Sequence, residues 1–122
     1  MEMNKIILWL DDIRNPQDLQ WIAFWKSVGD ITPDNVVWVK TYDEFVSYIT
    51  NNGLPYGICF DNDLGELLEG YDCAKFIVEY CLNNNLKLPF YKIQSANPVG
   101  YKNINTLLQN YNKFYETNER SC

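Results

Sequence analysis

The sequence predicts an α/β fold, a three-layer sandwich in which a short and mainly parallel sheet has helices on both faces. Four short apolar runs, at residues 5–10, 35–39, 56–60 and 90–94, alternate with segments of helical periodicity. The chain has 122 residues, which suffices for one hydrophobic core. Alternating strands and helices favour parallel pairing through right-handed crossovers, so we predict the strand order 2-1-3-4. No strand-like run follows Leu108, so a fifth strand is not expected.

The first apolar run, residues 5–10, is bounded by polar residues on both sides. This pattern is typical of a strand buried on both faces of a sheet. The runs at residues 35–39, 56–60 and 90–94 have the same character. We therefore expect four such buried strands.

The segment between the first two strands, residues 15–32, is apolar on most sides. It suits either a buried helix or an exposed aromatic surface, and we predict a helix here. Trp21 and Trp25 could then form a surface for a protein partner or a homodimer. This aromatic segment, residues 18–32, is the basis of an alternative function given below.

The helix between the second and third strands begins with a capping box. Thr41 and Glu44 have the spacing at which a threonine oxygen and a glutamate satisfy free amides of a new helix. Phe45 and Ile49 follow on one apolar face, and Gly53 is suited to end the helix.

Two more helices follow the third and fourth strands. Residues 73–81 carry apolar side chains at helical spacing, with polar residues between them. After the fourth strand, Asn97 is a favoured cap residue and Pro98 suits the first helical position. The apolar face of this last helix extends to Phe114, so we predict one domain over residues 1–115 and a polar tail over residues 116–122.

Composition excludes several classes of function. Ten basic and sixteen acidic residues give a formal charge of −6, which opposes binding to duplex nucleic acid. No apolar run approaches the length of a membrane span, and the acidic start of the chain is unlike a secretory leader, so we expect a cytoplasmic location. The four cysteines form no C-x-x-C pair and are expected to be reduced thiols.

Aspartates follow two of the predicted strands directly. Asp11 and Asp12 come after the first strand, and Asp61 and Asp63 come after the third. In the order 2-1-3-4 these two strands are neighbours, and ligands of such sheets bind beyond the carboxyl ends of the strands. Carboxylates brought together repel one another unless a cation or a shared proton neutralises them. Asp11, Asp12 and Asp61 are therefore predicted ligands of Mg²⁺ or Mn²⁺, with positions left for a phosphate oxygen.

The stretch from the fourth strand into the last helix, residues 93–100, is the predicted phosphate-binding loop. Unpaired amides at a helix start attract phosphate groups. Ser95 and Asn97 could add hydrogen bonds, and Gln94 could recognise a base or a sugar. Lys102, one turn into the helix, is a weaker candidate. Simple capping of the helix without a ligand is the alternative.

Arg14 follows the Asp11 and Asp12 pair and has two open uses. It could hold a phosphate through two parallel hydrogen bonds, or it could tie down a carboxylate of the pair. The sequence alone does not separate these uses.

Four blocks of the sequence resemble, in chain order, the signatures of the cyclic-phosphate-processing receiver-like domain family. They are WLDDIRNP at residues 9–16, FDNDLG at 60–65, GYD at 70–72 and QSANPVG at 94–100. The resemblance implies a variant of the response-regulator receiver fold, which is flavodoxin-like, in a protein of bacteria or their viruses. It also implies an acidic metal pocket that handles cyclic or terminal phosphates of nucleotides or RNA. In the general receiver pattern, Asp11 and Asp12 match the metal-binding pair, Asp61 matches the phosphoacceptor, and Ser95 matches the hydroxyl after the fourth strand.

Two positions depart from the family pattern. Family members usually carry histidine where this chain has Asn62 and Gln94, and the chain contains no histidine. Amides can bind a ligand, but they cannot transfer protons near neutral pH. Asn62 and Gln94 are therefore predicted to bind the ligand rather than to act as acid and base.

Three hypotheses on function follow. The first is metal-assisted recognition of a phosphorylated small ligand, such as a nucleotide or a cyclic or terminal phosphate. The second adds turnover: a metal-dependent phosphodiesterase with Asp61 and Asp63 as catalytic residues, Asp63 supplying the proton. The third is a non-catalytic adaptor, or a degenerate signalling receiver, that docks a protein through residues 18–32.

Overall fold

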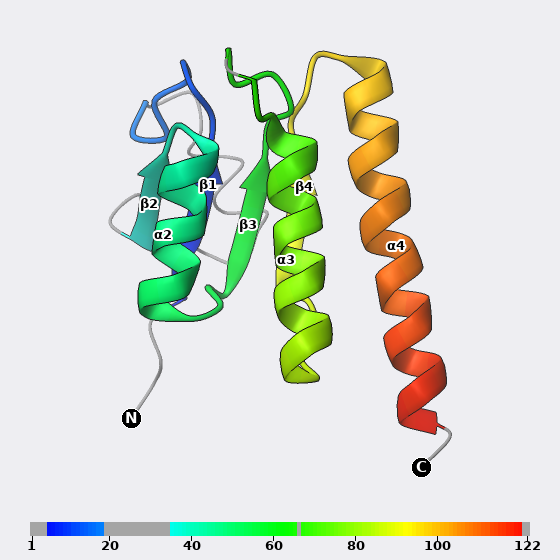
Figure 1. Cartoon of the computed structure of the whole chain (residues 1–122). Coiled ribbons are helices and arrows are strands. Elements are labelled where there is room, and N and C mark those ends of the chain that lie inside the picture. Colours follow the sequence, from blue (N-terminus) through cyan, green and yellow to red (C-terminus); the bar gives the residue numbers. More distant parts are fainter. Residues whose placement is uncertain (1–4, 19–34, 66, 121–122) are drawn as a thin grey trace.

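The computed structural model describes residues 5–18, 35–65 and 67–120. Their elements follow one another in the order β1, β2, α2, β3, α3, β4 and α4 (Figure 1). The predicted helix within residues 15–32, including Trp21 and Trp25, lies largely outside the described residues.

The sheet has four parallel strands in the order β2-β1-β3-β4, which confirms the predicted order. The strands are short, and their bounds are β1 Ile7–Leu10, β2 Val36–Val39, β3 Gly57–Phe60 and β4 Phe90–Ile93. After β4 the chain passes directly into α4, so the described part of the chain has no fifth strand. The two strands followed by aspartates, β1 and β3, are neighbours at the centre of the sheet.

The two faces of the sheet bury different residues because side chains alternate along a strand. Leu8, Leu10 and Phe60 belong to the main core, which also contains the inner faces of α2, α3 and α4. Ile7 and Trp9 lie in a second cluster with Cys59. Residues of both clusters are almost inaccessible to solvent, so the central strands are buried on both faces.

Three helices occur in the described residues: α2 Tyr42–Asn52, α3 Gly70–Asn84 and α4 Pro98–Arg120. In Figure 1, α3 stands between α2 and α4, and it packs against both. Helix α2 begins and ends as predicted: the Thr41 hydroxyl accepts a hydrogen bond from the Glu44 amide, and Gly53 has a φ of 80° at the other end. The Glu44 carboxylate accepts the amide of Lys40.

The predicted burial of the outer strands is wrong. In β2 only Val39 is buried, and in β4 exposed and half-buried residues alternate. The reason is the strand order, which places β2 and β4 at the edges of the sheet, where neighbours cover them less completely. Short apolar runs cannot distinguish an edge strand from a central one.

Helix α4 continues to Arg120. It therefore runs through residues 116–120, which the sequence assigned to a polar tail, and the division into a domain and a tail stays a prediction.

No helix of the described residues combines the length and apolar character that a membrane span requires. Cys59, Cys73 and Cys81 are buried free thiols, as expected.

Candidate functional site: a carboxylate pocket at the strand ends

The backbone places Asp11 and Asp61 side by side at the carboxyl edge of the sheet. The amide of Asp61 donates to the carbonyl of Leu10, and the amide of Asp11 donates to that of Val39. The hydrogen-bond ladders thus extend one residue beyond β1 and β3. This extension holds both aspartates at the rim, where the strands point upward in Figure 1.

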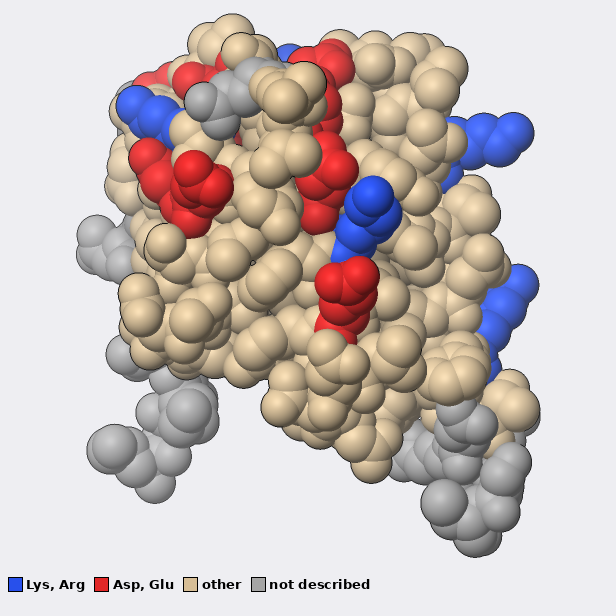
Figure 2. Space-filling model, in the orientation of Figure 1, with Lys and Arg blue, Asp and Glu red and all other residues tan. Residues whose placement is uncertain are grey.

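Three carboxylates meet at this rim. Asp11, Asp12 and Asp61 each have an oxygen within 4.8 Å of an oxygen of the other two. Asp11 is 2% exposed and Asp61 is 7% exposed, whereas Asp12 is half-buried. The predicted set of metal ligands is therefore brought together, and all of its donor atoms are carboxylate oxygens. In Figure 2, most of the acidic side chains visible from this side lie in the upper half of the molecule, which is the half that holds the rim.

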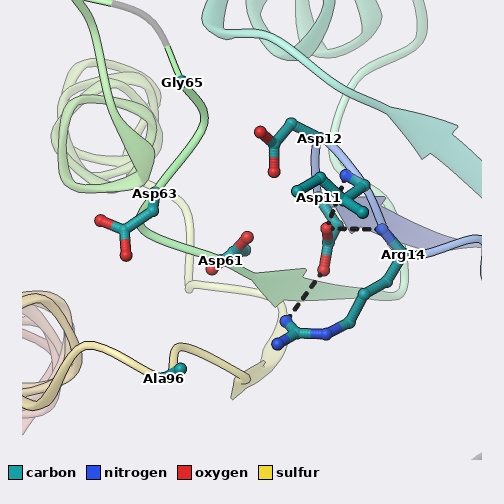
Figure 3. Close-up of a pocket in the computed structure, with 8 residues that line it drawn as sticks. Asp11, Asp12, Arg14, Asp61, Asp63, Gly65 and Ala96 are labelled. Carbon is teal, nitrogen blue, oxygen red and sulfur yellow. Dashed lines mark hydrogen bonds and ion pairs between the residues drawn. The ribbon is translucent and has the colours of Figure 1, made fainter.

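Asp11 is the most tightly held of the three. Its Oδ1 accepts the backbone amides of Ile13 at 3.0 Å and Arg14 at 2.9 Å. Its Oδ2 lies 3.3 Å from Nη1 of Arg14. The same nitrogen lies 3.4 Å from the carbonyl oxygen of Gln94. Arg14 thus ties down a carboxylate, one of its two predicted uses (Figure 3). Its contact with Gln94 connects this carboxylate to the end of β4.

The indole groups of two tryptophans, buried Trp9 and half-buried Trp38, fix the loop after β1. Nε1 of Trp9 donates to the carbonyl of Arg14 at 2.9 Å, and Nε1 of Trp38 donates to the carbonyl of Asp11 at 2.7 Å. An indole N–H that is shielded from solvent needs an acceptor, and here the acceptors are two backbone carbonyls of the loop that carries the acids. Sequence reasoning missed both anchors. The available signal was a tryptophan inside each of two adjacent strands.

The environment of Asp61 disfavours its charge. Burial, followed by the negative charge of Asp11, raises the pKa of Asp61 from 3.8 to about 6. The Arg14 guanidinium opposes this rise, but does not cancel it. The pocket therefore holds more negative charge than its own residues neutralise, which is the property that favours a bound cation.

The carboxylates line a pocket of about 330 Å³. Its other lining residues include Ile13, Gly65 and Ala96, which were not singled out from the sequence. Gly65 has a φ of 69°, and a Cβ at this position would lie 3.3 Å from Oδ2 of Asp12. A glycine here lets the loop after β3 pass close to the acids. The signal that could have found it was the glycine in the FDNDLG block.

Asp63 and Asn62 occupy different environments. Asp63 is exposed and lines the pocket, and Figure 3 shows Asp61 between it and Asp11. Asn62 is 9% exposed; its Oδ1 accepts the Tyr71 amide and its Nδ2 donates to Asp63. A Cβ at Gly100 would lie only 2.5 Å from Nδ2 of Asn62. Asn62 therefore joins the end of β3 to the starts of α3 and α4.

At the start of α4, side chains of the loop cap several of the amides that the sequence left free. Oδ1 of Asn97 accepts the amides of Val99 and Gly100, and the hydroxyl of Ser95 accepts the amide of Asn97. The expectation of unpaired amides therefore fails for Asn97, Val99 and Gly100, because side chains of the loop satisfy them. Phosphate binding by this loop stays a prediction. Nδ2 of Asn97 also donates to Oδ1 of Asp63 at 3.4 Å, so the cap reaches the rim of the pocket.

The remaining predicted residues do not line the pocket. Gln94 is half-buried, and its Nε2 is a buried donor that has no partner among the described residues. Lys102 is exposed on α4. Of the six predicted ligand-binding residues, only Arg14 is among the residues that line the pocket.

The family model of the cyclic-phosphate processing receiver domain matches residues 6–110, which is most of the chain. This chain belongs to that family. The carboxylate cluster of this receiver domain resembles the receiver metal site. One similar solved structure, described as a yeast Spc42 trimeric coiled coil fused to another protein, shares 19% identity with a TM-score of 0.56. That match covers 98% of this receiver domain and 87% of the other chain, and it supports the fold alone. The curated proteins contain no match.

Proposed function

We propose that this receiver domain binds a small ligand with a cyclic or terminal phosphate, such as a nucleotide, together with a divalent cation. Asp11, Asp12 and Asp61 would hold the cation. The observation that carries the proposal is the set of three carboxylate oxygens within 4.8 Å, two of them on residues that solvent barely reaches. A ligand set made only of oxygens fits Mg²⁺ or Mn²⁺.

The raised pKa of Asp61 supports the same assignment. A cation supplies the positive charge that Asp61 lacks, and it supplies positions at which phosphate oxygens can bind. Arg14 lines the pocket beside these carboxylates and carries a second positive charge. Ile13, which is 79% exposed at the same pocket, offers an apolar surface to the part of the ligand beyond the phosphate.

Thermal unfolding tests binding. We expect Mg²⁺ to raise the Tm, and 2′,3′-cyclic AMP to raise it further when Mg²⁺ is present. Saturation at about 100 times Kd corresponds to roughly 2.7 kcal/mol, which is about 10 °C or more for a domain of this size. Adenosine, which lacks the phosphate, should give no second shift. A Mg²⁺ effect no larger than that of NaCl at equal ionic strength would rule the proposal out.

Turnover is the second candidate, and the position of Asp63 favours it. Its carboxylate is exposed at the pocket, and two amide side chains, those of Asn62 and Asn97, orient it. In this reading water attacks the phosphorus, and the bond from phosphorus to one ribose oxygen breaks. Protonated Asp63 gives its proton to that leaving oxygen, the role that an imidazole would otherwise take, and the proton released by the attacking water restores Asp63. Asp61 is the second catalytic residue.

Hydrolysis of 2′,3′-cyclic AMP, followed by phosphorus NMR, tests the role of Asp63. We expect Asp63→Asn to slow turnover by about 100-fold or more while nucleotide binding persists, because a positioned general acid contributes about this factor. Asp43→Asn, which removes an exposed carboxylate on α2, is the matched control. Equal rates for Asp63→Asn and the parent protein would reject Asp63 as the acid.

The other predicted roles remain part of the proposal. Five residues that do not line the pocket would reach the ligand only if their side chains moved, because these side chains now cap helices, lie buried or stand away from the pocket. They are Asn62, Gln94, Ser95, Asn97 and Lys102. Docking of a protein through residues 18–32 also stays a prediction.

A further inference from the structure

Arg14 is held in the pocket by one of its three guanidinium nitrogens. Nη1 contacts both Oδ2 of Asp11 and the carbonyl of Gln94, at 3.3 and 3.4 Å. Within residues 5–18, 35–65 and 67–120, neither Nη2 nor Nε makes a hydrogen bond. The side chain is 41% exposed. Arg14 therefore has unused N–H donors at the wall of the pocket.

Arg14 and a cation would compete for the same carboxylate. Oδ1 of Asp11 already accepts two backbone amides, so Oδ2 is the oxygen that remains for both positive groups. Both contacts of Nη1 are long for hydrogen bonds to charged groups, which are usually about 2.7–2.9 Å. The guanidinium is thus weakly held at the one oxygen that a cation needs.

We propose that Arg14 couples cation binding to phosphate binding. Without a cation, Arg14 offsets the charge of Asp11. When a cation occupies the carboxylates, Arg14 leaves Oδ2 and presents its free N–H groups to the phosphate of the ligand. This inference rests on the proposed function, and it assigns to one residue both of the uses left open by the sequence.

The loop geometry makes this role separable from a structural one. The backbone of Arg14 is fixed at both ends, since its amide donates to Asp11 and its carbonyl accepts the Trp9 indole. Replacing the side chain therefore leaves the loop in place. Loss of a merely structural residue would weaken cation and phosphate binding together, whereas loss of a coupling residue changes them in opposite directions.

The test measures two affinities of Arg14→Gln. Calorimetric titration with Mg²⁺ alone should show about three- to tenfold tighter binding, because a competing and repelling charge is gone. Titration with inorganic phosphate at saturating Mg²⁺, followed by phosphorus NMR, should show about tenfold or more weaker binding, because a charge-assisted contact is lost. The factor by which bound Mg²⁺ increases the affinity for phosphate, and bound phosphate the affinity for Mg²⁺, should therefore be smaller in Arg14→Gln than in the parent protein.

Two further variants separate the causes. Arg14→Lys keeps the charge but lacks the planar fork, so Mg²⁺ affinity should stay near that of the parent while phosphate binding weakens. Lys113→Gln removes an exposed charge from the far half of α4 and should change neither affinity. If the parent binds no Mg²⁺, the proposed function fails, and the inference fails with it. If the parent binds both but Arg14→Gln weakens both or neither, only the inference is overturned.

Discussion

Replacing Asp61 by asparagine is expected to stabilise the cation-free protein while abolishing its response to Mg²⁺. The carboxylate of Asp61 is 7% exposed and has Asp11 and Asp12 as neighbours. Its negative charge therefore destabilises the folded protein, whereas in the unfolded chain the carboxylate is hydrated and has no such cost. An amide of nearly the same shape removes this penalty, but it also removes one of the three predicted ligands.

The effect depends on pH with a definite sign. Because the folded-state pKa of Asp61 is raised from 3.8 to about 6, folded protein binds a proton more tightly than unfolded protein between these values. The contribution of Asp61 to the free energy of unfolding of the parent protein should thus fall as pH rises from about 4 to about 6. At pH 7 we expect Asp61→Asn to be more stable by on the order of 2 kcal/mol, with little difference at pH 4.

Urea unfolding at pH 4 and pH 7, with and without Mg²⁺, checks both parts. Mg²⁺ should stabilise the parent protein at pH 7 and leave Asp61→Asn unchanged. Asp63→Asn is the matched control, because Asp63 is exposed and lies outside the cluster, so its stability should change by less than about 0.5 kcal/mol. A cation-free Asp61→Asn that is less stable than the parent at pH 7 would mean that the carboxylates are already neutralised.

Replacing Gly70 by alanine is expected to destabilise the fold by about 4 kcal/mol or more. A Cβ at this position would overlap the carbonyl oxygen of Asp61 and crowd the Cα of Asn62. These backbone atoms cannot move out of the way, because hydrogen bonds hold them in place. The amide of Asp61 donates to the carbonyl of Leu10, and the amide of Gly70 donates to the carbonyl of Asn62 at 2.8 Å. The first turn of α3 therefore has to move away from the end of β3, which carries Asp61.

Gly53→Ala gives the matched comparison for this prediction. Gly53 has a φ of 80°, but a Cβ there would meet no atom within 4 Å. Its replacement should cost about 1–3 kcal/mol from backbone strain alone. Urea unfolding of the two variants then separates strain from overlap. Gly70→Ala with the stability of the parent would show that α3 can shift freely relative to β3.

Much of the fold follows from patterns that are local in the chain. Thr41 and Glu44 begin α2 through contacts within one helical turn, and Gly53 ends it. The short apolar runs became strands, and their alternation with helices led to the parallel order. The edge position of β2 and β4 was missed because burial depends on neighbours that a run of apolar residues does not encode.

The candidate site also has features that could be predicted from the sequence and features that could not. The meeting of Asp11, Asp12 and Asp61 was predictable, since residues that follow adjacent parallel strands must share one edge. The anchoring of the loop by Trp9 and Trp38 was not, because it depends on where each indole points in the folded sheet, and Trp38 reaches Asp11 from 27 residues away in the chain. Whether Asn97 or a phosphate pairs with the first amides of α4 could not be predicted, because a helix cap and a phosphate site use the same residues.

The strands, the helices after them, the strand order and the three acids at the strand ends follow from the chain alone, because each depends on periodicity, caps or chain connectivity. How these acids behave depends on their surroundings in the folded protein. Burial beside Asp11 raises the pKa of Asp61, Arg14 lies against Asp11 and the end of β4, and Asn62 fills the space left by Gly100. Charge and packing of this kind depend on distances between residues far apart in the chain, which only the folded protein sets.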